Sequence, residues 1–556
     1  KGDFPAYYGG RLSSVIDVTT KSPCKDSVTG SGGIGLISSR LNIDIPIVKG
    51  KTALFLGARR TYFDVFTSAL NKMNEDTQGW EYIPNYHFQD FNGKLEHDIG
   101  KKDKIFLNGF LSRDKLAMRR SNFKFFLNWG NLASTLKWNH IFNSKVLMSN
   151  SLIYSSYNYK AGSAFPSFSF EVGSKIQELG IKSHIDYEKD EKNSFSIGLE
   201  TKRYVMDLGR LNGGSDSIKL DLSIPATFSD VATYASWSYK PNMRWKFESG
   251  VRLNYVNNTG LNFIGIEPRL TAAYRYTSRC TFKASLSRVY QNVHLVANSG
   301  SSLPIDYWYP STKKILPQYA NQAAAGVSIE LSSDFFFSYE VFYKQLRRQV
   351  DFKNNADLYF NKEIENDMII GKGWAYGGEF YLEKKKGRLT GWIGYTLAWS
   401  KRQFKEINFG VPFFARNDRR HDISFVTSFK FNKRLSFSSS WVFSSGVVTT
   451  LPMGKFIFQG FENEPISFAP DYGNVNNYRI PAYHRLDLGL VYRFFRKWGE
   501  SDLTFSIYNT YSRKNTYFIA FEPEQSEIPV AALQKLKALS VSLFSLIPSV
   551  TYNFKF

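Results

Sequence analysis

Apolar and polar residues alternate at every second position over much of the chain, and the last seven residues show this pattern most clearly. One face of the strand takes the apolar residues and the other takes the polar ones: Val550, Tyr552, Phe554 and Phe556 against Thr551, Asn553 and Lys555. A soluble edge strand could also alternate in this way. An alternating strand that ends in Phe is more typical of the closing strand of a bacterial outer-membrane β-barrel, in which one face meets lipid and the other meets a wet lumen. We therefore interpret Tyr552, Phe554 and Phe556 as a barrel assembly signal.

The same alternation recurs on both sides of ten short turns, and these turns predict the number of strands. The turns lie at 48–51, 100–103, 143–145, 189–193, 241–244, 278–280, 332–334, 384–387, 432–434 and 496–500. If each turn joins two strands at the periplasmic end, ten turns join twenty strands, and one further strand at each end of the chain gives about 22. Barrels of this size have a plugged lumen. A soluble sandwich would not need so many long strands, because soluble strands average about five or six residues.

The predicted fold class is therefore all-β, a transmembrane antiparallel β-barrel of about 22 strands with short periplasmic turns and long extracellular loops. The expected outer loops hold many of the Pro, Gly and Asn residues, as loops should. They lie at about 65–85, 209–225, 295–315, 353–371, 405–418, 450–477 and 518–540.

Composition fits a barrel and excludes membrane-spanning helices. The chain has 556 residues and a mean hydropathy of −0.32, and it contains no run of about 18 apolar residues. A low mean hydropathy is expected of a membrane barrel, because its strands are apolar only at every second position. The 48 Phe, 33 Tyr and 11 Trp residues suit lipid-facing positions and the aromatic girdles at the two membrane interfaces.

The formal net charge of +22 raises the question of an anionic partner. Nucleic-acid binding would need a basic patch on a recognisable module, and we find no such module. Basic rims would suit the phosphates of outer-membrane lipid and lipopolysaccharide. Much of the excess also lies in short solvated turns such as 384–387, so a partner is not required to explain it.

Several segments resemble TonB-dependent receptors, in the style of members from Bacteroidota. Residues 4–23, FPAYYGGRLSSVIDVTTKSP, resemble the last strand of the plug domain in that family. Stretches similar to later strand openings follow in the family's order at 316–322, 375–380, 391–397, 418–422 and 479–487. The resemblance divides the chain into the C-terminal tail of a plug domain, residues 1–27, and an outer-membrane β-barrel, residues 28–556.

The resemblance implies energised uptake of a nutrient across the outer membrane, driven by a TonB motor that pulls on a plug. Siderophore, haem, oligosaccharide and peptide all remain open as substrates. Residues 1–556 contain the tail of a plug but neither a whole plug nor a TonB box. Because the sequence lacks an initial Met and a signal peptide, we expect that further residues precede Lys1. If no plug precedes it, energy coupling is in doubt.

Two other functions remain open. The barrel could be a structural subunit of a larger outer-membrane assembly or secretion complex that docks surface lipoproteins, since a fold does not fix a function. It could also be a passive pore. An enzyme is not expected and no cofactor is predicted, because the seven His residues are scattered along the chain and no Gly-rich phosphate loop is present.

Two clusters are candidate ligand or partner sites. Asp306, Tyr307, Trp308 and Tyr309 place three aromatics, expected to be exposed, beside an acid. Such a cluster could stack on a ligand, anchor a surface lipoprotein, or simply pack its loop. Arg419 and His421 lie where an outer loop re-enters the barrel. They could face the lumen and hold an anionic ligand, or join a salt network in the lumen.

Overall fold

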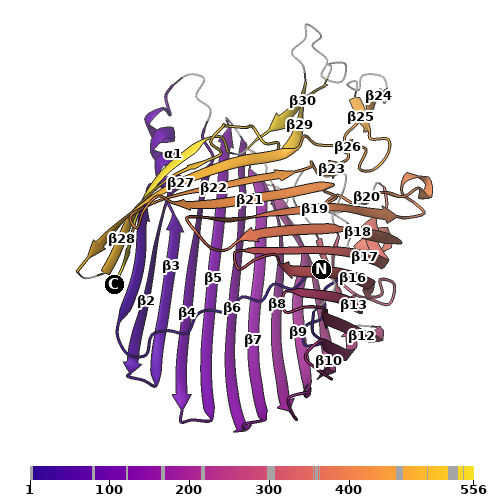
Figure 1. Ribbon diagram of the computed structural model, residues 1–556. Coiled ribbons are helices and arrows are strands. Elements are labelled where there is room, and N and C mark those ends of the chain that lie inside the picture. Colours follow the sequence, from indigo (N-terminus) through magenta and orange to yellow (C-terminus); the bar gives the residue numbers. More distant parts are fainter. Residues whose placement is uncertain are drawn as a thin grey trace.

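Most strands of the computed structural model belong to one antiparallel sheet that closes on itself (Figure 1). The first strand, β1 (Thr29–Gly35), pairs with β2 (Ser38–Val48) on one side and with the last strand, β31 (Ile547–Lys555), on the other. The structure describes residues 4–77, 82–120, 123–164, 169–214, 219–258, 260–296, 307–354, 356, 361, 363–458, 467–497, 499–523, 536–542 and 544–556.

Among these residues the sheet has 23 strands. The short strand β20 (Phe413–Phe414) and β21 both pair with the same edge of β19, at different parts of its length, so together they occupy one position in the wall. The barrel wall therefore has 22 strands, which confirms the predicted fold class and strand number. The other strands of the wall are β3 (Thr52–Thr61), β4 (Asn85–Ile99), β5 (Asp103–Arg120), β6 (Phe123–Asn143), β7 (Val146–Ala164), β8 (Ser169–Glu188), β9 (Asn193–Gly214), β10 (Lys219–Tyr239), β11 (Trp245–Asn258), β12 (Leu261–Arg275), β13 (Cys280–Gln291), β16 (Gln318–Glu330), β17 (Phe335–Phe352), β18 (Met368–Lys384), β19 (Leu389–Gln403), β21 (His421–Lys430), β22 (Leu435–Ser444), β27 (Tyr483–Arg496) and β28 (Gly499–Tyr508).

All ten short turns predicted from the sequence join neighbouring strands of the wall. The turn between β2 and β3 illustrates why. Gly50 takes a φ of 72°, a left-handed conformation that glycine adopts at little cost. Lys51 N donates to Val48 O at 2.9 Å and closes the turn.

The long connections carry small elements of their own. In the described part of the chain they comprise α1 (Phe63–Met73), η1 (Ile364–Asp367), η2 (Asn408–Gly410) and four two-stranded sheets: β14 (Val293–Val296) with β15 (Tyr307–Pro310), β23 (Val448–Thr449) with β26 (Tyr478–Arg479), β24 (Gly454–Phe458) with β25 (Ser467–Asp471), and β29 (Phe518–Pro523) with β30 (Leu536–Val541). None of the helices among the described residues is long and apolar enough to cross a membrane.

The prediction of a loop at 209–225 is wrong in extent. Strands β9 and β10 remain paired as far as Gly214 and Lys219, so most of that range is strand. Leu220, Leu222 and Ile224 continue the alternation of β10, and a stretch that alternates can extend a hairpin despite the Gly and Asp residues at its tip. Helix α1 within the loop at 65–85 was also not predicted.

Alternate side chains of each strand face outward or into the lumen. On β9, Ile197 and Leu199 are 56% and 51% exposed on the outer face, whereas Glu200 is buried on the lumen side. Inside the barrel an apolar cluster forms where loops fold inward against the strands. Val293 and Val296 of β14 and Ile364 of η1 pack there with lumen-facing residues of β9 to β11.

Candidate functional site in the barrel lumen

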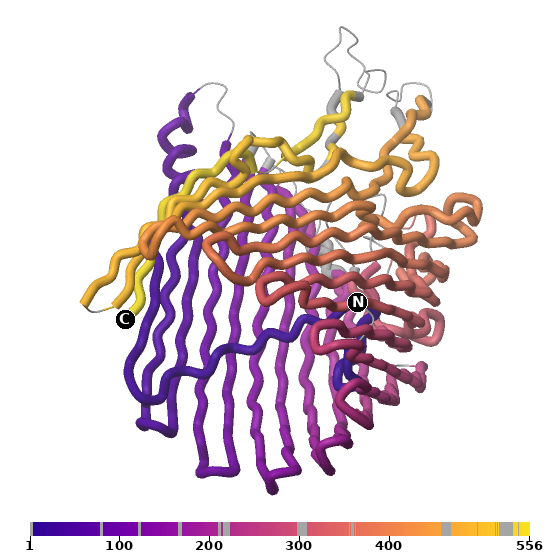
Figure 2. The backbone as a smooth tube through the Cα atoms, viewed as in Figure 1, coloured from indigo at the N-terminus to yellow at the C-terminus, as the bar shows by residue number. Residues whose placement is uncertain are grey.

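The N-terminal segment, residues 4–28, runs along the lumen wall from β12 to β4 (Figure 2). Basic side chains of the wall donate hydrogen bonds to its backbone carbonyls. Arg269 Nη1 lies 3.2 Å from Phe4 O, Lys182 Nζ lies 2.8 Å from Tyr7 O, and Lys94 Nζ lies 2.9 Å from Thr20 O. Because every residue has a backbone carbonyl, these three hydrogen bonds fix the course of the segment's backbone and do not select its side chains.

Aromatic contacts and one ion-pair cluster strengthen this attachment. Lys182 Nζ also lies 3.1 Å from the ring centroid of Tyr7, a cation–π geometry. Burial raises the pKa of Tyr7, and a 2.6 Å hydrogen bond to Asp17 raises the pKa of Tyr8 to about 12. At the other end, Lys25 Nζ lies 2.9 Å from Glu96 and 2.5 Å from Asp98 on β4.

A buried charge network lies beneath the start of the segment. Arg252 on β11 pairs with Glu200 on β9, and both side chains are more than 90% buried. Lys202 approaches Glu200 at 3.1 Å. Arg269 Nη2 lies 2.7 Å from Glu267, a residue with no exposed surface. Buried charges are tolerated only when they are paired, so these pairs fix the lumen face on which the segment lies.

Above this network, a hairpin occupies part of the lumen. Asn292, just before β14, donates to Asp230 on β10 at 2.9 Å. His294 on β14 contacts Ser311 and Gln318 at 2.9 Å each. Burial lowers the pKa of His294 to about 3, so this imidazole is neutral at physiological pH and acts as a hydrogen-bonding support.

The aromatic cluster expected at 306–309 lies on this hairpin. Tyr309 is buried in the apolar cluster, and Trp308 packs against it. The expectation that all three aromatics are exposed is therefore wrong for Tyr309, because its loop folds inward. Asp306 lies outside the described residues, and for Tyr307 only the backbone is described. A ligand or partner role for Trp308 stays a prediction.

Arg419 and His421 do not face the same way. His421 shares a face of β21 with Ile423 and Phe425, the second of which is 42% exposed, and lies 2.9 Å from the Tyr395 hydroxyl. His421 therefore lies on the outer face, and the prediction that it faces the lumen is wrong. His421 is the first residue of β21, and the alternation of side chains along that strand places it on the same face as Ile423 and Phe425.

Arg419 reaches the lumen side of the same strand end. Its Nη1 lies 3.3 Å from Ser444 Oγ, and that hydroxyl donates to Asp422. The neighbouring Asp418 is fully buried, accepts from Ser400 N at 2.7 Å, and pairs with Arg479 at 2.5 Å. This cluster ties the returning loop to the wall, and an anion-binding role for Arg419 stays a prediction.

The terminal aromatics lie at the seam that closes the barrel. Tyr552 opposes Ile34 of β1, and Phe554 opposes Gly32. The rings of Phe554 and Phe556 lie over Gly32 and Gly30, where an added Cβ would collide with them. Their role as an assembly signal stays a prediction, but their packing explains why β1 needs glycine at these positions.

The lumen contacts of the N-terminal segment were not predicted from the sequence. A signal was present, because β9 places Glu200 and Lys202 two residues apart, between the outward-facing Leu199 and Arg203. Charges at alternate positions of a long apolar strand indicate a lumen face. The partners of those charges lie on other strands, and only the register of the sheet brings them together.

Comparison with known proteins identifies the fold family. The family model described as TonB dependent receptor-like, beta-barrel, matches residues 61–509. No curated protein matches the chain. Among solved structures, the chain is similar to the ferric-catecholate import receptor Fiu from E. coli K12, with 12% identity and a TM-score of 0.65 over 97% of this chain and 83% of that one.

Two further solved structures have the same fold. The ferric yersiniabactin uptake receptor FyuA from Yersinia pestis has 12% identity and a TM-score of 0.69 over 97% of this chain and 81% of that one. The ferric citrate transporter FecA has 11% identity and a TM-score of 0.65 over 97% and 80%. This chain belongs to the TonB-dependent receptor-like β-barrel family.

Proposed function

We propose that this barrel imports a nutrient across the outer membrane with energy supplied by a TonB motor. The attachment of the N-terminal segment to the lumen wall carries the proposal. An importer that remodels a plug needs a fixed joint between plug and barrel, so that a pull on the plug is not lost in the connection. The contacts at Arg269, Lys182, Lys94 and Lys25 supply such a joint over residues 4–25.

An iron chelate is the first substrate class to test. The solved relatives are named for ferric catecholate, ferric yersiniabactin and ferric citrate. Cells that express the protein should accumulate a radiolabelled ferric chelate, and a protonophore or loss of TonB should abolish the accumulation. Accumulation that persists without TonB would contradict energised import. Failure with every chelate, together with TonB-dependent uptake of haem, oligosaccharide or peptide, would keep the mechanism and change the substrate.

A second function, a structural subunit that docks surface lipoproteins, is favoured by an apolar extracellular surface. A cleft of about 790 Å³ lies between the loop around η2 and the loop from β23 to β26. The two loops are joined by Asn408, which donates to Val475 O at 3.1 Å and accepts from Val475 N at 2.7 Å. Phe409 and Met453 at this cleft are 98% and 76% exposed, and clustered exposed apolar side chains mark interaction sites.

Deletion of the gene separates the two functions. A structural subunit predicts a damaged envelope on every medium, measured by sensitivity to detergents and large antibiotics. An importer predicts normal envelope resistance and poor growth when one nutrient is limiting. A strain that fails on one nutrient and is otherwise healthy would exclude the structural function.

A further inference from the structure

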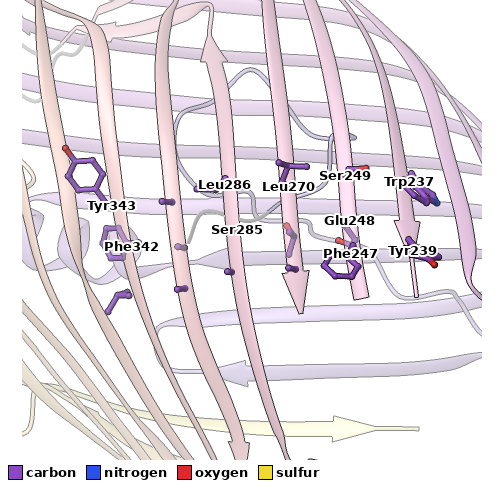
Figure 3. Close-up of a pocket in the computed structure, with 17 residues that line it drawn as sticks. Trp237, Tyr239, Phe247, Glu248, Ser249, Leu270, Ser285, Leu286, Phe342 and Tyr343 are labelled. Carbon is purple, nitrogen blue, oxygen red and sulfur yellow. The ribbon is translucent and has the colours of Figure 1, made fainter. Parts of the chain in front are cut away.

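The outer face of the barrel contains a hollow of about 850 Å³ on strands β10 to β17 (Figure 3). Its floor is a row of alanines in register across three neighbouring strands. Ala272 of β12 pairs with Ala284 of β13, and Ala284 pairs with Ala325 of β16. Trp237 and Tyr343 stand at opposite sides of the hollow.

The hollow faces away from the lumen. Ala272 and Ala284 share their strand faces with Leu270 and Leu286, which are 55% and 59% exposed. Arg269, which precedes Leu270 and faces the other way, is buried on the lumen side, where it holds the N-terminal segment. The floor therefore faces the membrane, and because every strand of the closed wall is already paired, no edge is open there for another strand.

A row of aromatic residues separates the hollow from the short turns. Trp245, Tyr274 and Phe282 are paired in register one step closer to the turns than the alanine row. The rings of Trp245 and Tyr274 lie 4.6 Å apart. Such rows mark the interface between hydrocarbon and headgroups. The hollow thus lies on the hydrocarbon side of the periplasmic girdle.

Uncompensated cations lie just beyond the aromatic row. Lys240 and Arg244 are in the turn between β10 and β11, and Arg279 is in the turn between β12 and β13. All three are exposed. Their side chains make no ion pair with any residue in the described part of the chain, whereas the nearby Lys246 is paired with Glu248 at 2.5 Å.

We propose that the hollow binds an acyl chain of an anionic phospholipid from the periplasmic leaflet, with Lys240, Arg244 and Arg279 holding its phosphate. A smooth wall would contact lipid chains only from one side. Because the alanine side chains are small, a lipid acyl chain can lie in the hollow between Phe247 and Val341 and make dispersion contacts on both sides. The cations then meet a phosphate at the level of the girdle, a complementarity that an apolar protein partner would leave unused.

Photo-crosslinking with a defined lipid tests the proposal. The whole chain is reconstituted in phosphatidylethanolamine vesicles that contain phosphatidylglycerol with a diazirine in its acyl chain, and the labelled peptides are mapped. We expect labelling of the 270–286 and 323–343 stretches several-fold above the labelling of β2 to β4. Equal labelling around the barrel, or a protein–protein crosslink at these residues in place of lipid, would overturn the proposal.

Two sets of variants separate the site for the acyl chain from the site for the phosphate. Ala284→Phe with Ala325→Phe should lower the labelling to that of the remaining wall, and the milder Ala325→Leu should lower it in part. Ala58→Phe is the matched control, because Ala58 faces outward between Leu41 and Phe91, far from the hollow. Heat-dependent gel migration checks that each barrel is folded. If the variants that fill the hollow fold correctly but are labelled as strongly as the unchanged protein, the site is refuted.

Replacement of Lys240, Arg244 and Arg279 by Gln tests the phosphate contact. The labelling ratio of phosphatidylglycerol to a matched phosphatidylcholine probe should fall several-fold toward one, while the position of the label stays the same. A ratio that does not change would refute the role of the three cations. Stronger labelling by a lipopolysaccharide probe than by phosphatidylglycerol would refute the assignment to the periplasmic leaflet.

Discussion

At the scale of single residues, the protein depends on buried charges that are paired across strands. Glu200 and Arg252 come from β9 and β11, with β10 between them. Their pairing is therefore possible only on the concave lumen side, where side chains of neighbouring strands converge. Arg252 also lies within 3.5 Å of Ala6 O, so one side chain links the wall to the N-terminal segment.

Arg252→Leu should destabilise the barrel and loosen the segment. The change leaves Glu200 more than 90% buried without its arginine, which costs about 3–5 kcal/mol when a buried pair is broken. Urea unfolding followed by tryptophan fluorescence measures the loss. Arg59→Leu is the control: Arg59 is paired with Asp90 but 52% exposed, so its loss should cost less than about 1 kcal/mol. Equal losses for both variants would contradict this account.

Gly32→Val should weaken the seam between β1 and β31. A side chain at Gly32 would collide with the ring of Phe554, and overpacking of this kind costs about 1–3 kcal/mol. The fraction of heat-modifiable barrel on a gel should fall. Gly109→Val in β5 is the matched control, since a Cβ at Gly109 meets nothing within 4 Å. Recovery of closure in Gly32→Val with Phe554→Ala would assign the defect to this contact.

At the scale of elements, the sequence predicted the wall well and the lumen poorly. The short turns and the outward faces follow from local patterns, such as Gly50 in a turn and Ile197 alternating with Ser196. The inward fold of the β14–β15 hairpin depends on contacts with strands far away in the sequence, such as Asn292 with Asp230. No local pattern distinguishes such a loop from an exposed one, so Tyr309 was expected at the surface.

Substitutions on the hairpin separate packing from binding. Tyr309→Ala should cost about 3–5 kcal/mol of stability, because Tyr309 is buried in the apolar cluster. Tyr309→Phe should retain most of that stability. Trp308→Ala, at a half-buried position, should lower the apparent affinity for substrate at nearly unchanged stability if Trp308 contacts the ligand. Uptake kinetics and urea unfolding measure the two effects, and unchanged kinetics for Trp308→Ala would remove it from the binding site.

The attachment of the segment at Lys25 should be insensitive to pH over the physiological range. Burial alone would lower the pKa of Lys25, but its hydrogen bonds to Asp98 and Glu96 outweigh burial and raise it. Because the pKa of Lys25 is raised in the folded protein, its ion pairs stabilise the attachment fully at any pH below the ordinary lysine pKa of 10.5. This stabilisation is lost only as the pH rises through the higher pKa of the folded protein. Trypsin protection at Lys21 should therefore be constant at neutral pH and fall in Lys25→Gln. Loss of protection at mildly alkaline pH in the unchanged protein would contradict this prediction.

At the scale of the whole molecule, two kinds of chain segment fill the lumen of a 22-stranded wall. The N-terminal segment crosses it from β12 to β4, and the loops around β14, β15 and η1 pack against the strands β9 to β11. The two attachments differ in chemistry. The loops add buried apolar side chains to their hydrogen bonds, whereas hydrogen bonds, ion pairs and a cation–π contact hold the segment. Removal of the segment would therefore leave the apolar cluster of the lumen in place.

Removal of residues 1–27 should increase the ion conductance of the barrel in planar bilayers. The deletion opens the strip of lumen between β12 and β4, while the wall keeps all its strands, since β1 begins at Thr29. The charges that the segment covered, such as Lys182, would then meet water in the lumen, so the barrel should still fold. Phe409→Ser, a change on the extracellular surface, is the control and should leave conductance unchanged. Equal conductance with and without the segment would mean that the inward loops alone close the barrel.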